Sequence, residues 1–231
     1  MAKKKIVVLT GAGMSAESGL KTFRDANGLW EGHDVMEVAS PQGFARNPEL
    51  VLEFYNQRRR QLLQVLPNAG HKALVELEPY FQVDIITQNV DNLHEQAGST
   101  NVLHLHGELL KVRSTADENL VLEWTKDLVL GDLDPQGNQL RPHIVWFGEM
   151  VPMLVPAMRI TEAADILLIV GTSMQVYPAA SLINYVSPGT PIYFIDPKPN
   201  LTSSPVDPLF VFAEKATAAV PKLVKTLIEE A

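Results

Sequence analysis

The chain of 231 residues contains no cysteine, which excludes disulfide bonds and thiolate metal sites. It also has no long hydrophobic run, since nothing approaches the roughly 20 apolar residues that span a membrane. Near the start, the apolar run at residues 6–9 is shorter than the core of a secretory signal peptide. From these absences we expect a cytoplasmic protein that has no membrane partner.

An excess of positive charge is missing as well. The 19 Lys and Arg residues are outnumbered by 27 Asp and Glu residues, which gives a formal net charge of −8. Nucleic acid backbones are bound by clustered Lys and Arg, and the one internal cluster is Arg58-Arg59-Arg60, so we expect no specific nucleic acid partner. The hydrophobic content of 46% is enough for one sizeable core, or for one large domain with a small insert.

Short apolar runs alternate with helix-like stretches, which is typical of a doubly wound parallel α/β sheet of the Rossmann-like type. We expect strands at residues 5–10, 83–87, 102–105, 144–146, 166–170, 192–195 and 209–212. We expect helices at residues 48–66, 71–78, 155–164, 178–186 and 220–230. The last helix would have Pro221 in its first turn, where proline is tolerated, and a buried face running from Val220 to Ile228.

Two stretches interrupt this alternation. Residues 32–70 contain a helical pattern without a convincing central strand, and residues 112–141 are polar and rich in Asp, Gly and Asn. We expect these two stretches to form a smaller inserted domain. The Rossmann-like domain would then comprise residues 1–31, 71–111 and 142–231.

A glycine-rich turn directly follows the first expected strand. Gly11, Ala12 and Gly13 let the backbone turn tightly and approach a ligand closely, while Ser15, Ala16 and the following residues can open a helix whose N–H groups face an anion. This pattern indicates a nucleotide. A plain tight turn is the alternative, because the full Gly-x-Gly-x-x-Gly fingerprint is absent.

Further polar motifs follow in a fixed order, and most of them come directly after an expected strand. They are Thr22-Phe23-Arg24, Gln88-Asn89-Val90-Asp91-Asn92-Leu93-His94, His104-Leu105-His106-Gly107-Glu108, Val145-Trp146-Phe147-Gly148-Glu149 and Gly171-Thr172-Ser173. Ligand sites of doubly wound sheets lie beyond the carboxyl ends of the strands, so these motifs can converge on one cleft.

Taken together, and over residues 5 to 225, the motifs resemble those of the sirtuins, a family of NAD-dependent protein deacylases. Ala39 and the pair Tyr55 and Arg58 make the chain most similar to the class III bacterial deacylases of the CobB type. The resemblance implies NAD as cofactor, acyl-lysine proteins as substrates, and nicotinamide and O-acyl-ADP-ribose as products. It also implies a helical module and a ribbon in the small domain, and we expect a monomer. An NAD-dependent ADP-ribosyl transferase and a non-catalytic NAD-binding regulator stay open as alternatives.

The resemblance also implies the catalytic residues. His106 would take a proton from a ribose hydroxyl, for which its ordinary pKa of roughly 6.5 is suited. Strand alternation alone does not choose between His104 and His106, and a structural histidine at a strand end is the alternative. Asn89 and Asp91 would hold the nicotinamide carboxamide and the reacting ribose, with Gln88 beside the ribose. Without the family, residues 88–92 read equally as a polar helix cap.

The remaining cofactor contacts come from several loops. Arg24, next to Phe23, would pair with phosphate or gate the loop over the cofactor. Gly171, Thr172 and Ser173 would contact phosphate or the adenosine ribose, and Ala216 would lie near the adenine. Asp196 ends an expected strand, where a carboxylate binds ribose hydroxyls and repels a 2′-phosphate, which favours NAD over NADP; an ordinary turn before Pro197 is the alternative.

Substrate contacts are implied for two segments. Val145, Phe147 and Gly148 would pair with the acyl-lysine peptide by strand addition, although the segment alone reads as a buried strand end. On a helix, Tyr55 and Arg58 share a face and would bind the carboxylate of succinyl- or malonyl-lysine, with room left by Ala39. The alternative is a solvated Arg58-Arg59-Arg60 run beside a packed Tyr55. Acetyl-lysine would also be used, because a roomy pocket need not exclude it.

The chain departs from the family at the metal site. Sirtuins typically bind tetrahedral zinc through two Cys-x-x-Cys pairs, and here Val112-Arg113-Ser114-Thr115 and Gly131-Asp132-Leu133-Asp134 take their places. We expect no metal, because the acidic residues Asp117, Glu118, Asp132 and Asp134 read as solvated loop charges. The ribbon would then be held by apolar packing, with candidates Leu120, Leu122, Trp124, Leu128, Val129, Leu130 and Leu133.

Overall fold

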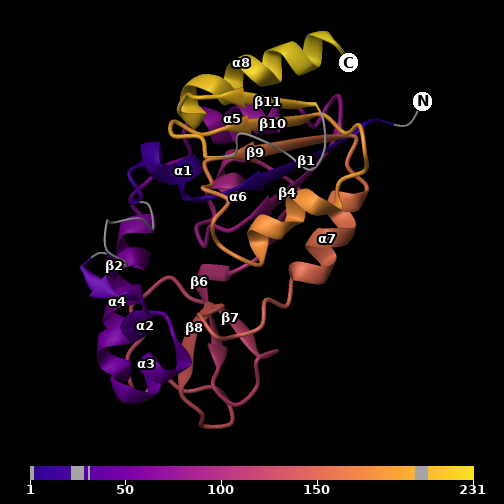
Figure 1. Cartoon of the computed structure of the whole chain (residues 1–231). Helices are drawn as coiled ribbons and strands as arrows, with labels where there is room; N and C mark the ends of the chain where they lie inside the picture. The colour runs from indigo at the N-terminus through magenta and orange to yellow at the C-terminus, as the bar shows by residue number, and fades with distance from the viewer. Residues whose placement is uncertain (1–2, 22–28, 31, 201–207) are drawn as a thin grey trace.

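The computed structural model describes residues 3–21, 29–30, 32–200 and 208–231. Within them a large parallel sheet with helices on both faces forms one part of the molecule, and a small group of helices and antiparallel strands forms the other (Figure 1). The predicted α/β class is therefore confirmed. None of the helices in this described part is long and apolar enough to cross a lipid bilayer.

The large sheet has six strands in the order β11-β10-β9-β1-β4-β5, and every pair is parallel. Their bounds are β1 Lys5–Thr10, β4 Gln82–Thr87, β5 Val102–His104, β9 Ile166–Val170, β10 Ile192–Ile195 and β11 Leu209–Phe212. The predicted strands are confirmed at these places. β1 lies between β4 and β9, and the continuous apolar sequence of β1 and β9 is what a strand covered on both faces requires.

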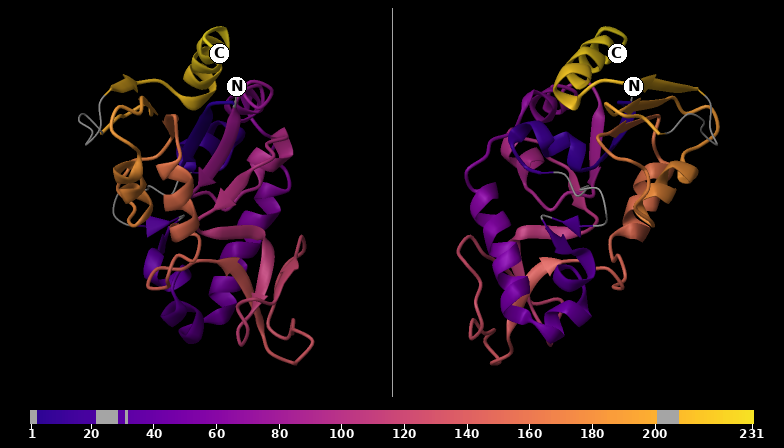
Figure 2. Two further views of the ribbon diagram at one scale, coloured as in Figure 1. Left: turned by 90° about the vertical axis from the view of Figure 1, so that its right-hand side faces the viewer. Right: turned by 60° about the vertical axis from the view of Figure 1, so that its left-hand side comes forward.

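Helices cover both faces of this sheet. Alternate residues of β1 point to opposite sides, so Ile6 and Val8 pack with α5 (Ala69–Val75) and α8 (Ala216–Glu229). Val7 and Leu9 pack instead with α7 (Leu154–Glu162) and the 3-10 helix η2 (Ala179–Tyr185). Figures 1 and 2 show α8 and α7 on opposite sides of the sheet. Two buried clusters, one on each face, thus form the core of a doubly wound fold.

The smaller part combines helices with a second sheet. Its helices are α2 (Val35–Val38), α3 (Pro41–Arg46) and α4 (Pro48–Leu62), preceded by the short pair β2 (Leu29–Trp30) and β3 (His33–Asp34). Three antiparallel strands, β6 (Gly107–Ser114), β7 (Val121–Glu123) and β8 (Leu140–Ile144), form the sheet in the order β7-β6-β8. The predicted domain boundaries at 111/112 and 141/142 fall inside β6 and β8, and the division into two domains stays a prediction.

Three predicted elements differ in the structure. The strand expected at residues 144–146 is β8, which ends at Ile144 and belongs to the antiparallel sheet. The helix expected at 178–186 is the 3-10 helix η2. The last helix begins at Ala216 rather than Val220, so Pro221 lies inside it. Proline is common in the first turn of a helix, but this helix begins at the small residues before Pro221, where Ala216 and Ala219 pack against the sheet.

The ribbon is not held together in the way that the apolar pattern predicts. Leu128 is fully buried and packs with Leu52, Val112 and Leu140, and Trp124 lies against this cluster. Leu120 is half-buried, and the prediction fails for four other candidates, because Leu122, Val129, Leu130 and Leu133 are exposed. Leu122 lies on the short strand β7, whereas Val129, Leu130 and Leu133 lie in the connection between β7 and β8, which packs against the cluster through Leu128 and Trp124.

Hydrogen bonds to one carboxylate link the two ribbon segments, residues 112–115 and 131–134, that take the places of the family's Cys-x-x-Cys pairs. Asp134 Oδ2 accepts from the Ser114 hydroxyl at 2.6 Å, and Oδ1 accepts from the backbone N–H groups of Gln136 and Asn138, both at 2.8 Å. Ser114 Oγ in turn accepts from Ala116 N at 3.0 Å. These oxygen and amide groups do not fit the tetrahedral thiolate set of a zinc ribbon, and within the described residues no group of three His, Cys, Asp or Glu side chains is placed to hold a metal.

We expect Asp134→Asn to lower the melting temperature by several degrees near neutral pH, because an amide cannot accept all of these hydrogen bonds. The hydrogen bonds, first that from Ser114, lower the pKa of Asp134 from 3.8 to about 2. A carboxyl whose pKa is lower in the folded state stabilises the fold above its unfolded pKa, and this stabilisation is lost as pH falls from about 4 towards 2. The two melting temperatures should therefore converge over that range, as measured by circular dichroism.

Glu118→Gln is the matched control, since it removes a charge from an exposed ribbon position, and its melting curve should match the wild type. Incubation with a strong chelator should leave the melting temperature and the activity of the wild type unchanged. Equal melting temperatures of Asp134→Asn and the wild type at neutral pH would contradict the role of this carboxylate.

Candidate functional site

The strands β1, β4, β9 and β10 all end at one edge of the large sheet, and a cavity of about 690 Å³ lies beyond that edge. Its size is that of a site for a small molecule or cofactor. Every predicted site residue that the structure describes lines it, namely Gly11, Ala12, Gly13, Ser15, Ala16, Ala39, Tyr55, Arg58, Gln88, Asn89, Asp91, His106, Val145, Phe147, Gly148, Gly171, Thr172, Ser173, Asp196 and Ala216. The two other predictions, Phe23 and Arg24, lie outside the described residues.

The glycine turn after β1 packs directly on the turn after β9. Gly13 N donates to Gly171 O at 2.8 Å, and Gly11 N donates to Val170 O at 3.0 Å. A Cβ at Gly13 would lie 2.7 Å from Gly171 Cα, and Gly171 itself has a φ of +62°. These glycines are therefore required by the contact between the two turns. The helix predicted to open at Ser15 begins earlier, as the short α1 (Ala12–Ser15), and continues into the 3-10 helix η1 (Ala16–Ser18).

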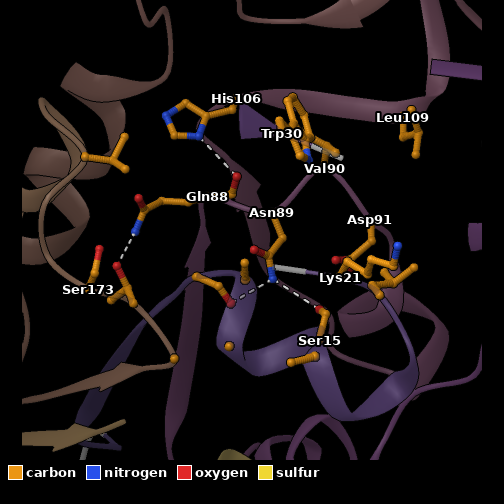
Figure 3. Close-up of a pocket in the computed structure, with 18 of the residues that line it drawn as sticks. Ser15, Lys21, Trp30, Gln88, Asn89, Val90, Asp91, His106, Leu109 and Ser173 are labelled. Carbon is orange, nitrogen blue, oxygen red and sulfur yellow. Dashed lines mark hydrogen bonds between the residues drawn. The ribbon is translucent and has the colours of Figure 1, made fainter. Parts of the chain in front are cut away.

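Two amide side chains of the loop after β4 form hydrogen bonds to both of these turns. Asn89 Nδ2 donates to Gly11 O at 3.0 Å and to Ser15 Oγ at 3.1 Å, while Gln88 Nε2 donates to Thr172 Oγ1 at 3.1 Å. Figure 3 shows Asn89 reaching towards Ser15 and Gln88 towards the Ser173 side of the cavity. The two amide side chains thus fix the relative positions of three loops that come from distant parts of the sequence.

Asp91 occupies the same loop and is only 6% exposed. Burial raises the pKa of this carboxyl, while hydrogen bonds from Leu93 N, at 3.1 Å, and from the Ser15 hydroxyl work against the increase. The N-cap residue of α6 (Leu93–Ala97) is Asn92, whose side chain makes no capping hydrogen bond, and the residue before it, Asp91, accepts from Leu93 N instead. It also lines the cavity, so a capping role does not exclude a ligand-binding one.

The two histidines of the His104-Leu105-His106 motif have opposite environments. His106 lines the cavity, and its Nδ1 lies 3.1 Å from Gln88 O, which accepts only, so Nδ1 carries the proton and Nε2 has a free lone pair. Burial lowers the pKa of His106, so its ring is neutral at neutral pH. His104 lies outside the cavity lining, 2.7 Å from Glu95 Oε1. Burial opposes its charged form, but Glu95 outweighs burial and raises the pKa of His104.

A second end of the cavity is formed by α4 and the loop before α3. Tyr55 and Arg58 lie one turn apart on α4 and both line the cavity, as predicted from their spacing, with Ala39 beside them. The Arg58 guanidinium stacks 3.2 Å from the centre of the Phe54 ring and 5.0 Å from that of Trp30. Tyr55 is fully buried, and this burial raises its pKa, so its hydroxyl stays protonated at neutral pH.

The basic cluster on α4 separates into three environments. Arg58 faces the cavity, whereas Arg59 is fully buried and donates to Leu109 O at 3.1 Å and to Asn56 Oδ1 at 2.7 Å. Only Arg60 is exposed, where it pairs with Glu53 and Asp127. The alternative of a solvated arginine run therefore describes Arg60 alone.

The segment predicted to pair with a peptide is a loop that begins after β8. Val145 N donates to His106 O at 2.9 Å, and Phe147 N donates to Ala39 O at 2.9 Å. Gly148 has a φ of +89° and continues the turn. Trp146 N donates to Glu149 Oε2 at 2.7 Å, so the segment joins the histidine end of the cavity to the Ala39 end and uses three of its N–H groups inside the protein.

Several aromatic residues of the cavity were not singled out from the sequence. Trp30 lies close to Val90 beside the cavity, as Figure 3 shows, and Tyr177 lines it from the loop after β9 while remaining 74% exposed. Trp146 belongs to the motif at residues 145–149, but no role was predicted for it from the sequence. The available signal was weak: Tyr177 precedes a proline in a loop that follows a buried strand, and such loops carry ligands in α/β folds.

The doubly wound sheet, with its cavity beyond the strand ends lined by glycine turns, amide and hydroxyl side chains, defines an α/β protein of the dinucleotide-binding class. The model of the Sir2 family matches residues 11–178. This chain belongs to the Sir2 family.

The most similar relatives support this membership along the whole chain. An NAD-dependent protein deacylase of Helicobacter pylori is 59% identical over 228 residues, which cover 99% of each protein. Another, from Bacteroides thetaiotaomicron, is 52% identical over 231 residues, covering 97% of this chain and 98% of the relative. Among solved structures, a Sir2 homologue in complex with NAD is 43% identical with a TM-score of 0.87, covering 99% of this chain and 91% of that one. A mutant Sir2 homologue bound to ADP-ribose has 42% identity and a TM-score of 0.89, with 99% and 93% coverage.

We expect Gly13→Ala to abolish measurable NAD binding and to lower the melting temperature, because the added methyl group would overlap the Gly171 backbone. Gly189→Ala is the control: its φ of +85° makes alanine strained there, but no atom lies within 4 Å of the added Cβ. Calorimetric titration with NAD should give wild-type affinity for the control. Wild-type affinity in Gly13→Ala would contradict the packing argument.

Proposed function

We propose that this protein is an NAD-dependent protein-lysine deacylase that removes succinyl and malonyl groups, and also acetyl groups, from lysine side chains. The observation that supports this most directly is that one cavity holds a neutral, half-buried imidazole, an amide and carboxyl pair, and a tyrosine with an arginine. These are His106, Asn89 with Asp91, and Tyr55 with Arg58. One water molecule would be consumed, and the products would be nicotinamide, O-acyl-ADP-ribose and the free lysine.

The residues lining the cavity fit NAD by their chemistry. Ser15, Thr172 and Ser173 offer hydroxyl groups at the glycine turns, and Asp196, at the end of β10, offers a carboxylate suited to ribose hydroxyls. The Gly13 and Gly171 backbones leave no room for a Cβ, so the turns present bare backbone to the cavity. Asn89 and Asp91 together offer a donor and acceptors that match a carboxamide.

When bound, NAD supplies an anomeric carbon that becomes electrophilic as nicotinamide departs. In this scheme Asn89 and Asp91 hold the carboxamide end of the cofactor, and Gln88, fixed by Thr172, lies beside the ribose. His106 Nε2 accepts the proton of a ribose hydroxyl, since the Gln88 carbonyl fixes its proton on Nδ1. The loop at Val145–Gly148 would cover the acyl-lysine and limit access of water to the reacting atoms.

The acyl end of the cavity favours a carboxylate. Arg58 carries a permanent positive charge, and Tyr55 stays protonated, so a negatively charged acyl chain would gain a charge-assisted contact and a hydroxyl hydrogen bond. Ala39 is only 3% exposed and leaves the space next to these residues free of a longer side chain. An acetyl group makes neither contact but fits the same space.

We further propose that the protein acts as a cytoplasmic monomer.

We expect His106→Ala to lower kcat by about 10² to 10⁴ while leaving NAD affinity within about twofold, because the base acts after the cofactor has bound. Burial lowers the pKa of His106, so wild-type kcat/KM should be constant near neutral pH and fall only below about pH 6.5, as the ring gains a proton. Steady-state rates on an acyl-lysine peptide between pH 5 and 9, roughly, would measure both effects.

His104→Gln is the matched control, since His104 stands two residues away but outside the cavity lining. We expect it to keep most of the activity and the same acid limb. More than about a tenth of wild-type activity in His106→Ala, measured at saturating NAD, would remove His106 from the role of base.

We expect Arg58→Met to lower kcat/KM on a succinyl-lysine peptide by about tenfold or more, because one hydrogen bond to a charged group is lost. Turnover of the acetyl-lysine peptide should change by much less. Arg60→Met, on the same helix but exposed and paired with Glu53 and Asp127, should leave both substrates unaffected. If Arg58→Met reduced both activities equally, the preference for acidic acyl groups would be withdrawn and the deacylase function kept.

Product analysis tests the function itself. Mass spectrometry of a reaction with NAD and an acyl-lysine peptide should detect deacylated peptide and O-acyl-ADP-ribose in equal amounts. An ADP-ribosylated protein without deacylated peptide would support a transferase, and no product from any acyl peptide would support a non-catalytic NAD-binding protein.

A further inference from the structure

The hydroxyl of Tyr55 has a fixed direction for hydrogen bonding. Trp146 Nε1 lies 3.0 Å from Tyr55 Oη, and the indole N–H donates only, so the tyrosine oxygen is the acceptor. The single proton of Tyr55 must therefore point elsewhere. Among the described residues no acceptor takes this proton, although the side chain is fully buried and lines the cavity.

Trp146 is itself held firmly in place. Its side chain is 2% exposed, and the Arg141 guanidinium lies 3.4 Å from the centre of its ring. Its backbone N–H donates to Glu149 Oε2 at 2.7 Å. Glu149 in turn accepts from Arg141 Nη1 at 2.6 Å and from Arg113 Nη2 at 3.2 Å. The indole N–H that faces Tyr55 thus belongs to a packed, charge-paired cluster rather than to a freely rotating side chain.

The charges around this end of the cavity are unequal. Glu149 is one carboxylate facing the two guanidinium groups of Arg113 and Arg141, and Arg58 adds a third positive charge on the side of α4. The positive charges of Arg58 and Arg141 act to lower the pKa of the Tyr55 hydroxyl, and the negative charge of Glu149 acts to raise it. A positive surplus beside a hydroxyl that can only donate to a ligand favours an acyl chain that ends in a negatively charged acceptor.

We propose that Trp146 is a positioning residue that sets acyl specificity: its indole N–H occupies the acceptor site of Tyr55 and thereby commits the tyrosine hydroxyl to donate to the carboxylate of the acyl chain. This inference rests on the proposed deacylase function and deepens it. Trp146 also lines the cavity, and the proposed role is the one that it exerts through the Tyr55 hydroxyl.

The test compares Trp146→Phe, Tyr55→Phe and the double variant on succinyl- and acetyl-lysine peptides with saturating NAD. Trp146→Phe keeps an aromatic ring but removes the N–H, and we expect it to lower kcat/KM for succinyl-lysine by about threefold to tenfold, through KM, with the acetyl value within about twofold. Tyr55→Phe should lower the succinyl value by about tenfold. In the Tyr55→Phe background, Trp146→Phe should change the succinyl value by less than about twofold, because the two residues act through one hydroxyl.

Trp124→Phe is the matched control, since Trp124 lies in the ribbon and its Nε1 donates to Asp127 O. It should leave the ratio of succinyl to acetyl activity unchanged. Melting temperatures of all variants report folding. If Trp146→Phe does not fold, Tyr55→Phe alone decides, because an unchanged succinyl KM in that variant overturns the proposal.

Equal losses on both peptides in Trp146→Phe, or additive losses in the double variant, would show a purely structural role and overturn the inference. A wild-type enzyme that removes acetyl but not succinyl groups would overturn it as well while keeping the deacylase function. A wild-type protein that removes neither group would overturn the proposed function itself.

Discussion

The site depends on the close approach of two backbones, those of Gly13 and Gly171. Parallel pairing of β1 with β9 brings the ends of these strands side by side, and the turns that follow touch through a hydrogen bond of 2.8 Å. Neither position has room for a Cβ. Because Asn89 and Gln88 are then bonded to groups in these same turns, the contact also fixes the loop that carries Asp91. A shift of one strand would therefore move the whole lining of the cavity.

Much of the fold was predictable because buried parallel strands correspond to short apolar runs in the sequence. Residues 166–170, all apolar, form a central strand with every side chain buried. The prediction failed where tertiary contacts decide the outcome. Ala216 starts α8 because it packs against the sheet, which no local signal at Pro221 reveals. The prediction that the leucines of the ribbon are buried failed for the same reason, because apolar residues in a sequence do not show which of them other parts of the chain will cover.

The site was predictable to the extent that polar residues follow strands. Gln88, Asn89 and Thr172 stand directly after apolar runs, and the topology of a parallel sheet brings such positions together. Strand periodicity alone did not choose between His104 and His106, and it was the family resemblance that selected His106; the structure places His104 at the end of β5 beside Glu95 and His106 at the cavity. Trp146 could not be predicted at all, since its contact with Tyr55 joins residues 91 positions apart.

Strand β6 carries two neighbouring residues, one of which contacts the ribbon while the other contacts the residues that line the cavity. Ser114 donates to Asp134 and so links the two ribbon turns, while the preceding Arg113 reaches the opposite way to Glu149. Glu149 holds the backbone of Trp146, and Trp146 holds the hydroxyl of Tyr55. An unbroken series of hydrogen bonds and one peptide link therefore runs from Asp134 to the acyl end of the cavity. In a ribbon without thiolates, the carboxylate of Asp134 organises the ribbon, and the carboxylate of Glu149 holds Trp146 beside the cavity. Hydrogen bonds to Ser114 and to Arg141 lower the pKa of these two carboxyls, so both stay charged in the folded protein at a pH where they would gain a proton in the unfolded chain, and each keeps its partners in place.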